Sequence, residues 1–187
     1  PIHDPAFVIP EIAHQVGVRE NLNENLSQKL VPILRDKRLL LILDNFEHLL
    51  PAALSVSDLL SKTISLRVLA TSREILNISG EHVFVVKTLS LPPNNTTASE
   101  LSNYGASQLF IVRAQAADAN FSISNAAVKQ VIEICHYLDG LPLAIELAAA
   151  RVAHLPIGKL ISLLKSSAGR LTLLTTGPRD WHERQQT

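Results

Sequence analysis

Two runs of strand length constrain the fold of this chain most strongly. The first, LLLIL, spans Leu39–Leu43, and the second, LRVLA, spans Leu66–Ala70. Between them, Phe46 to Leu60 has the apolar spacing of a helix. Strands with few polar residues that alternate with helices are typical of parallel sheets with right-handed crossovers. We therefore predict an α/β fold in which the first strand is covered on both faces.

Similar patterns predict further elements on either side of these strands. A valine-rich stretch, His82–Val86, is predicted to be a third strand. Near the start of the chain, one helix is expected to begin at the cap Asp4–Pro5 and to end at Gly17. A second helix is expected over residues 23–36, with a kink at Pro32.

The second half of the chain has helical patterns only. It begins after a polar, proline-containing segment, LPPNNTTASELSN at residues 91–103, which we interpret as a domain boundary. The predicted helices run from Gly105 to Ala117, from a cap at Ser124 to Gly140, from Pro142 to about Leu155, and from Ile157 to Lys165.

Composition limits the classes of function that this chain can serve. Apolar residues make up 47% of the 187 residues, so a sizeable core can form. Seventeen basic and 17 acidic residues cancel, which argues against a chain-wide basic surface for nucleic acid. The single cysteine, Cys135, fits a reducing cytoplasm, and the seven histidines lack metal-site spacing. Because the chain contains no methionine, we expect it to be an internal piece of a longer protein.

Asp44 directly follows the first strand, at the edge where parallel sheets bind ligands. A carboxylate there suits Mg²⁺, which combines one or two carboxylates with phosphates and waters. The second strand ends in Thr71, Ser72 and Arg73. If the strands are neighbours, Arg73 projects from the same edge and can stabilise charge on a terminal phosphate. An ordinary turn at Asp44 and a surface arginine at Arg73 remain the alternatives.

Three segments in this order resemble the signal-transducing STAND class of P-loop ATPases. They are LLLILDNFEHLL at 39–50, LRVLATSRE at 66–74 and GLPLAIELAAARV at 140–152. The last is explained equally well as a tight corner between two helices. The closest resemblance is to the NB-ARC-type ATPase module of large bacterial transcriptional regulators, such as the LuxR-type and antibiotic-regulator groups, and it covers nearly the whole chain.

The resemblance implies a role for each candidate site residue. The strand that ends at Asp44 would be the Walker B strand, with Asp44 organising Mg²⁺. Arg73 would be the first sensor of the terminal phosphate, and Thr71 would lie beside it at the nucleotide. The loop Gly140–Leu143, with Gly140, Leu141 and Pro142, would pack against adenine and ribose, and Pro142 would be the main contact.

The resemblance also implies a domain organisation. Residues 1–91 would be the C-terminal part of a P-loop NTPase domain, 92–103 a linker, 104–168 a helical (ARC-type) lid, and 169–187 the start of a winged-helix domain with Trp181 in its core. The implied cofactors are ATP or ADP with Mg²⁺. The implied partners are the nucleotide, sensor and DNA-binding domains of the same polypeptide, and other copies in the ATP-bound state. We expect a cytoplasmic protein with no membrane contact.

Two departures from the family pattern limit these expectations. No G-x-x-x-x-G-K-[ST] loop is present, since the only Gly-Lys pair, Gly158-Lys159, lies in a helical pattern. We expect the P-loop strand to lie upstream, so that the sheet here has a gap beside the Arg73 strand and this piece binds nucleotide poorly. Asn45 stands where fast ATPases carry a second acid, and an amide orients water without taking its proton. Glu47 is the next carboxylate, but we expect it to point elsewhere, which favours a slow ATPase switch.

Two other functions remain open. The first is a non-catalytic scaffold whose helical half docks partner proteins. The second is direct DNA binding through the tail, where Arg170, Arg179 and Arg184 are offset by Asp180 and Glu183.

Overall fold

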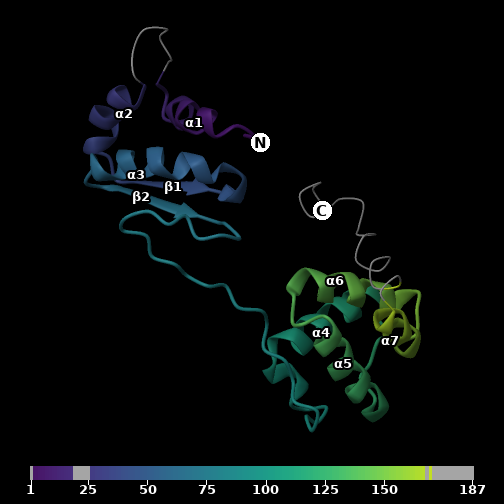
Figure 1. The fold of residues 1–187 in the computed structure, drawn as a ribbon. Helices are drawn as coiled ribbons and strands as arrows, with labels where there is room; N and C mark the ends of the chain where they lie inside the picture. Colours follow the sequence, from purple (N-terminus) through teal and green to yellow (C-terminus); the bar gives the residue numbers. More distant parts are fainter. Residues whose placement is uncertain (1, 19–25, 167–168, 170–187) are drawn as a thin grey trace. The chain divides into compact units, whose positions relative to one another are not determined.

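The computed structural model describes residues 2–18, 26–166 and 169. The chain divides into two compact units, Pro1–Val85 and Val86–Thr187 (Figure 1). This division lies earlier in the chain than the linker predicted at 92–103, because Leu89 and Leu91 pack against the helical core of the second unit.

The first unit is α/β. Its elements are η1 (Pro5–Phe7), α1 (Val8–Gln15), α2 (Leu26–Arg35), β1 (Leu39–Leu43), η2 (Phe46–Ala52), α3 (Ala53–Ser61) and β2 (Leu66–Ala70). The two strands pair in parallel, with Leu39 opposite Leu66 and Leu43 opposite Ala70. Both strands therefore occupy the predicted residues, and the predicted cap is confirmed, since the Asp4 side chain accepts a hydrogen bond from the Ala6 N–H.

Only one face of this small sheet is covered by the described residues. Helices α1, α2 and α3 lie on the same side of the strands (Figure 1), and Leu39, Leu41 and Leu43 pack against their core. The alternate residues of the strands point the other way, so that Ile42 is 64% exposed and Leu69 is also exposed. The prediction that the first strand is covered on both faces is therefore wrong for this part of the chain.

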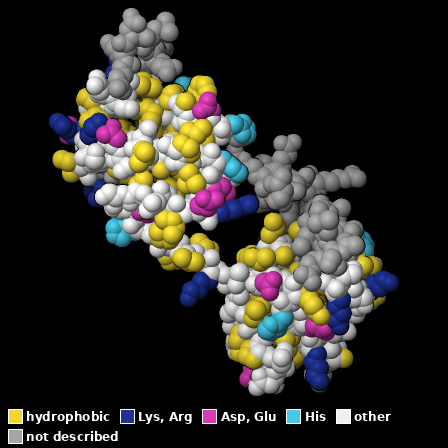
Figure 2. Space-filling model, viewed as in Figure 1, with side chains coloured by type: hydrophobic (Ala, Val, Ile, Leu, Met, Phe, Trp, Pro, Cys, Tyr) yellow, Lys and Arg dark blue, Asp and Glu magenta, His cyan; other side chains and the backbone are white. Residues whose placement is uncertain are grey.

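The third predicted strand, His82–Val86, is absent from the described structure. The segment forms no ladder, and its apolar side chains are open to solvent, with Phe84 88% exposed. Hydrophobic side chains are correspondingly visible on the molecular surface (Figure 2). A strand requires a neighbouring edge as well as suitable side chains, and the described sheet contains only the β1–β2 pair. The valines therefore give this segment a strand propensity, but the described structure contains no strand for it to pair with.

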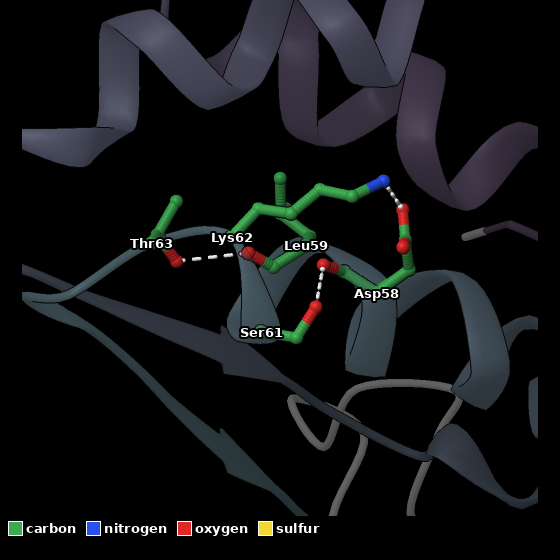
Figure 3. Close-up of polar contacts among 5 residues, drawn as sticks. All are labelled: Asp58, Leu59, Ser61, Lys62 and Thr63. Carbon is green, nitrogen blue, oxygen red and sulfur yellow. Dashed lines mark hydrogen bonds and ion pairs between the residues drawn. The ribbon is translucent and has the colours of Figure 1, made fainter.

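Hydrogen bonds hold the end of α3 and direct the chain toward β2 (Figure 3). Thr63 Oγ1 donates to the Leu59 carbonyl at 2.9 Å, and Ser61 Oγ donates to the Asp58 carbonyl at 2.7 Å. Lys62 Nζ also forms an ion pair with the Asp58 carboxylate at 2.6 Å. Because the last carbonyls of a helix lack intrahelical donors, the hydroxyl bonds stabilise this end and fix where β2 begins.

The second unit is helical. Its elements are η3 (Leu101–Asn103), α4 (Gly105–Ala117), α5 (Asn125–Tyr137), α6 (Pro142–Ala150), η4 (Arg151–Ala153) and α7 (Ile157–Lys165). Ser124 caps α5 as predicted, since its side chain accepts a hydrogen bond from the Ala127 N–H at 3.2 Å. Cys135 is buried in the core, and this burial raises the pKa of its thiol to about 12. The cysteine is therefore a packed thiol, as the sequence indicates.

The predicted winged-helix segment, 169–187, lies outside the described residues apart from Gly169. The same holds for its core residue Trp181 and for the charged residues of the tail. Among the helices that are described, none has the length and apolar character needed to cross a membrane.

Candidate functional site

The carboxyl ends of β1 and β2 bring Asp44 and Thr71 together. Because Leu43 is opposite Ala70 in the parallel register, the next residue of each strand emerges at the same edge. Thr71 Oγ1 donates to Asp44 Oδ1 at 2.6 Å and accepts from the Asn45 N–H at 2.9 Å. The Thr71 backbone extends the pairing, with its N–H on the Leu43 carbonyl at 2.9 Å and its carbonyl on the Phe46 N–H at 2.8 Å. Thr71 therefore fixes the position of an exposed carboxylate.

Asn45 makes the turn that follows this carboxylate. Its backbone lies in the left-handed region, with φ 57° and ψ 46°. Asparagine adopts this region more readily than most residues that have a side chain. The turn reverses the chain so that Phe46, the next residue, is buried in the core. Asn45 thus has a structural role, and its predicted role in orienting water stays a prediction.

Arg73 lies at the same edge and forms an ion pair with Glu47. The Arg73 Nε is 3.4 Å from Oε1 of Glu47. The Glu47 side chain is only 12% exposed, whereas that of Arg73 is 87% exposed. The pairing with Arg73 was not predicted, and the expectation that Glu47 does not serve as the second acid stays a prediction.

The chemistry of this edge is suited to a metal–phosphate group. It combines an exposed carboxylate, a hydroxyl held against it, and an exposed guanidinium from the neighbouring strand. In the part of the chain that the structure describes, no group of three histidine, cysteine, aspartate or glutamate side chains is arranged to hold a metal. A single exposed carboxylate fits Mg²⁺, which takes few protein ligands and completes its coordination shell with phosphate oxygens and water. It does not fit a structural zinc site.

A second group of predicted residues forms the corner between α5 and α6. Gly140 has φ +67°, and a Cβ at this position would lie 2.5 Å from the Leu89 carbonyl oxygen. The Leu89 N–H also donates to the Gly140 carbonyl at 2.9 Å. Packing therefore explains the glycine. It does not explain why Leu141, 49% exposed, and the exposed Pro142 present an apolar surface beside it.

These residues belong to the second unit and form a group of their own. An exposed leucine and proline at the start of a helix can pack against the flat face of a purine. The contact of Leu89 with Gly140 was not predicted. The signal in the sequence was the glycine itself, because a position requires glycine where φ is positive or where another backbone group approaches closely.

Comparison with known proteins relates the chain to bacterial regulators. It is 35% identical, over its whole length, to proteins of Mycobacterium bovis and Mycobacterium tuberculosis that carry the provisional name HTH-type transcriptional regulator. The chain spans only about a fifth (20%) of the length of these relatives. It is also 42% identical over 123 residues, 65% of its length, to an uncharacterized protein of Mycobacterium tuberculosis, of which this match covers 28%.

No protein-family model matches the chain. No solved structure matches it either. The relation to transcriptional regulators therefore rests on alignments that cover the whole of this chain and 20% of the mycobacterial proteins.

Proposed function

We propose that this chain is part of a nucleotide-dependent switch in a transcriptional regulator, a P-loop ATPase module of the STAND, NB-ARC-like class. The observation that carries the proposal is the arrangement of Asp44, Thr71 and Arg73 at the carboxyl edge of a parallel strand pair. Asp44 would hold Mg²⁺ on ATP or ADP, and the bound ion would neutralise phosphate charge. Arg73 would contact the terminal phosphate of ATP.

The open sheet supports the P-loop fold. A parallel pair of strands is rarely stable by itself, and it gains stability from further strands and from cover on both faces. The exposed Ile42 and Leu69 mark a bare face, and the exposed Val83–Val86 segment has strand composition without a ladder. A P-loop strand from elsewhere in the polypeptide, inserted between β2 and this segment, would give the segment a partner, and a helix next to that strand would cover the bare face. Mycobacterial relatives about five times longer have room for it, since the chain covers 20% of their length.

The residues next to Asp44 favour slow hydrolysis. Asn45 offers an amide, which orients a water molecule but does not accept its proton. Glu47, the nearest carboxylate in sequence, lies against Arg73. A module with these residues would serve as a switch whose ATP and ADP states differ, rather than as a rapid ATPase. Gly140, Leu141 and Pro142 would supply the apolar contact to the base.

Nucleotide binding by the natural full-length polypeptide tests this proposal. Isothermal calorimetry with ATP and ADP, with and without Mg²⁺, would compare the wild type with Asp44→Ala and Arg73→Ala. We expect Asp44→Ala to abolish the Mg²⁺ dependence. Arg73→Ala should weaken ATP by about tenfold or more with little effect on ADP, because it removes a charge-assisted contact to the terminal phosphate.

The chain offers matched controls for both substitutions. Asp36→Ala removes an exposed aspartate just before β1, at the opposite edge of the sheet. Arg67→Ala removes an exposed arginine from β2, the strand that leads into the turn of Arg73. The Arg67 guanidinium donates hydrogen bonds to the Ile64 and Leu66 carbonyls. Neither control should alter nucleotide binding. A wild-type polypeptide that binds neither nucleotide would rule out the switch.

The scaffold function has one observation in its favour. A surface hollow of about 660 Å³ lies along α5 in the second unit. It is lined by Asn94, Lys129, Ile132, Glu133, His136 and Tyr137. If nucleotide binding fails and substitutions along this hollow abolish complexes with the regulator's other domains, the chain is a docking scaffold.

A further inference from the structure

The ion pair between Glu47 and Arg73 joins a fixed group to an exposed one. Glu47 is held in η2 between Phe46 and Leu49, which are both buried in the core of the first unit. Its carboxylate is therefore positioned by packing, and only 12% of its side chain is exposed. Arg73 extends from the turn after β2 with 87% of its side chain in solvent. Of the two partners, Arg73 is the one that can move.

The contact between them is weak enough to exchange. The Nε–Oε1 distance is 3.4 Å, whereas a strong charge-assisted hydrogen bond between nitrogen and oxygen is about 2.7–2.9 Å. With 87% of the Arg73 side chain in solvent, screening by water keeps this ion pair weak. A terminal phosphate carries more charge than a carboxylate and offers three acceptor oxygens, so it competes well for a guanidinium.

We propose that Glu47 is a positioning residue that holds Arg73 away from the phosphate site whenever no terminal phosphate is present. This proposal rests on the proposed function. In the nucleotide-free and ADP-bound states, Arg73 pairs with Glu47. ATP binding transfers the guanidinium from Glu47 to the terminal phosphate, so ATP must break a pair that ADP leaves intact. Glu47 thereby lowers the affinity for ATP relative to ADP and biases the switch toward its ADP state.

The test measures ATP and ADP affinities of the full-length polypeptide in a double-mutant cycle. The variants are Glu47→Gln, Arg73→Ala and the two combined. Glu47→Gln should strengthen ATP binding about two- to fivefold, the range that an exposed ion pair supplies, and leave ADP unchanged. In the Arg73→Ala background, Glu47→Gln should change neither affinity, because the residue that it restrains is gone.

The control and a second variant keep the test decisive. Glu74→Gln removes an exposed carboxylate adjacent to Arg73 in sequence and should leave the ATP-to-ADP ratio unchanged. If Glu47→Gln fails to fold, Glu47→Asp keeps the charge but withdraws it by one methylene. Glu47→Asp should then raise the ratio of ATP affinity to ADP affinity, by a smaller factor than Glu47→Gln.

The possible outcomes separate this inference from the function on which it rests. If the wild type binds neither nucleotide, both fall. If Arg73→Ala weakens ATP selectively but Glu47→Gln leaves the ratio unchanged or weakens ATP, only the role of Glu47 is overturned. The same holds if Glu47→Gln strengthens ATP equally without Arg73, since the carboxylate would then repel phosphate directly.

Discussion

The two units of this chain differ in how completely they bury their apolar residues. In the second unit, Phe110 and Leu160 are fully buried, and few large apolar residues, such as Val112 and Leu141, are exposed among the described residues. The first unit has a core of its own, yet it leaves Ile42 and Leu69 on a bare sheet face and Phe84 in an unpaired segment. The difference indicates that the α/β unit, more than the helical unit, has surfaces that fit further strands and helices.

A matched pair of phenylalanines provides the strongest test of this contrast. Phe110→Ala should destabilise the second unit by about 3–5 kcal/mol, because it leaves a cavity in a closed core. Phe84→Ala should cost less than about 0.5 kcal/mol in the isolated chain, because that side chain is 88% exposed. Hydrogen exchange read by mass spectrometry gives the opening free energy of each unit separately.

The same experiment in the full-length polypeptide sharpens the comparison. If the Val83–Val86 segment becomes a strand there, Phe84→Ala should cost about 1.5–3 kcal/mol, the value of burying its side chain. An equal, small effect in both contexts would mean that this segment stays unpaired. The incomplete-sheet explanation for the first unit would then be lost.

The second prediction concerns the corner at Gly140, which packs against Leu89. Gly140→Ala should destabilise this unit by about 2–4 kcal/mol, from the left-handed backbone and the overlap with Leu89. Gly17→Ala is the control, because Gly17 has φ +80° but a Cβ added there would meet nothing within 4 Å. It should cost only the backbone term, about 1–2 kcal/mol. Equal losses on chemical denaturation would show that Leu89 yields readily.

Features that depend on local sequence were predicted better than features that depend on long-range contacts. The bounds of β1, β2 and α4 follow from apolar spacing, and Ser124 caps α5 because capping depends on a few adjacent residues. His82–Val86 was misassigned because strand formation depends on a second segment.

The candidate site shows the same difference between local features, which were predicted, and a contact that was not. That Asp44 and Thr71 meet at one edge follows from two strand ends, which the sequence locates. The pairing of Glu47 with Arg73 follows the left-handed turn at Asn45, a conformation that asparagine permits but does not require. The sequence therefore did not predict this ion pair.

The last prediction concerns Thr71, which belongs to both the fold and the candidate site. Thr71→Val removes the hydroxyl that donates to Asp44 and accepts from the Asn45 N–H. Because the site is exposed, the loss of stability should be only about 0.5–1.5 kcal/mol. In the full-length polypeptide, the free energy of Mg²⁺-dependent nucleotide binding should weaken by more than this loss of stability, because the Asp44 carboxylate is no longer held in one orientation.

Thr71→Ser is the matched control, because it keeps the hydroxyl and should retain both stability and affinity. Denaturation and calorimetry on the same samples separate the two quantities. If Thr71→Val lowers stability and leaves the Mg²⁺ dependence intact, the hydroxyl only closes the end of the sheet. If the affinity falls while Thr71→Ser restores it, the hydrogen bond that joins the two strand ends also positions the metal-binding carboxylate.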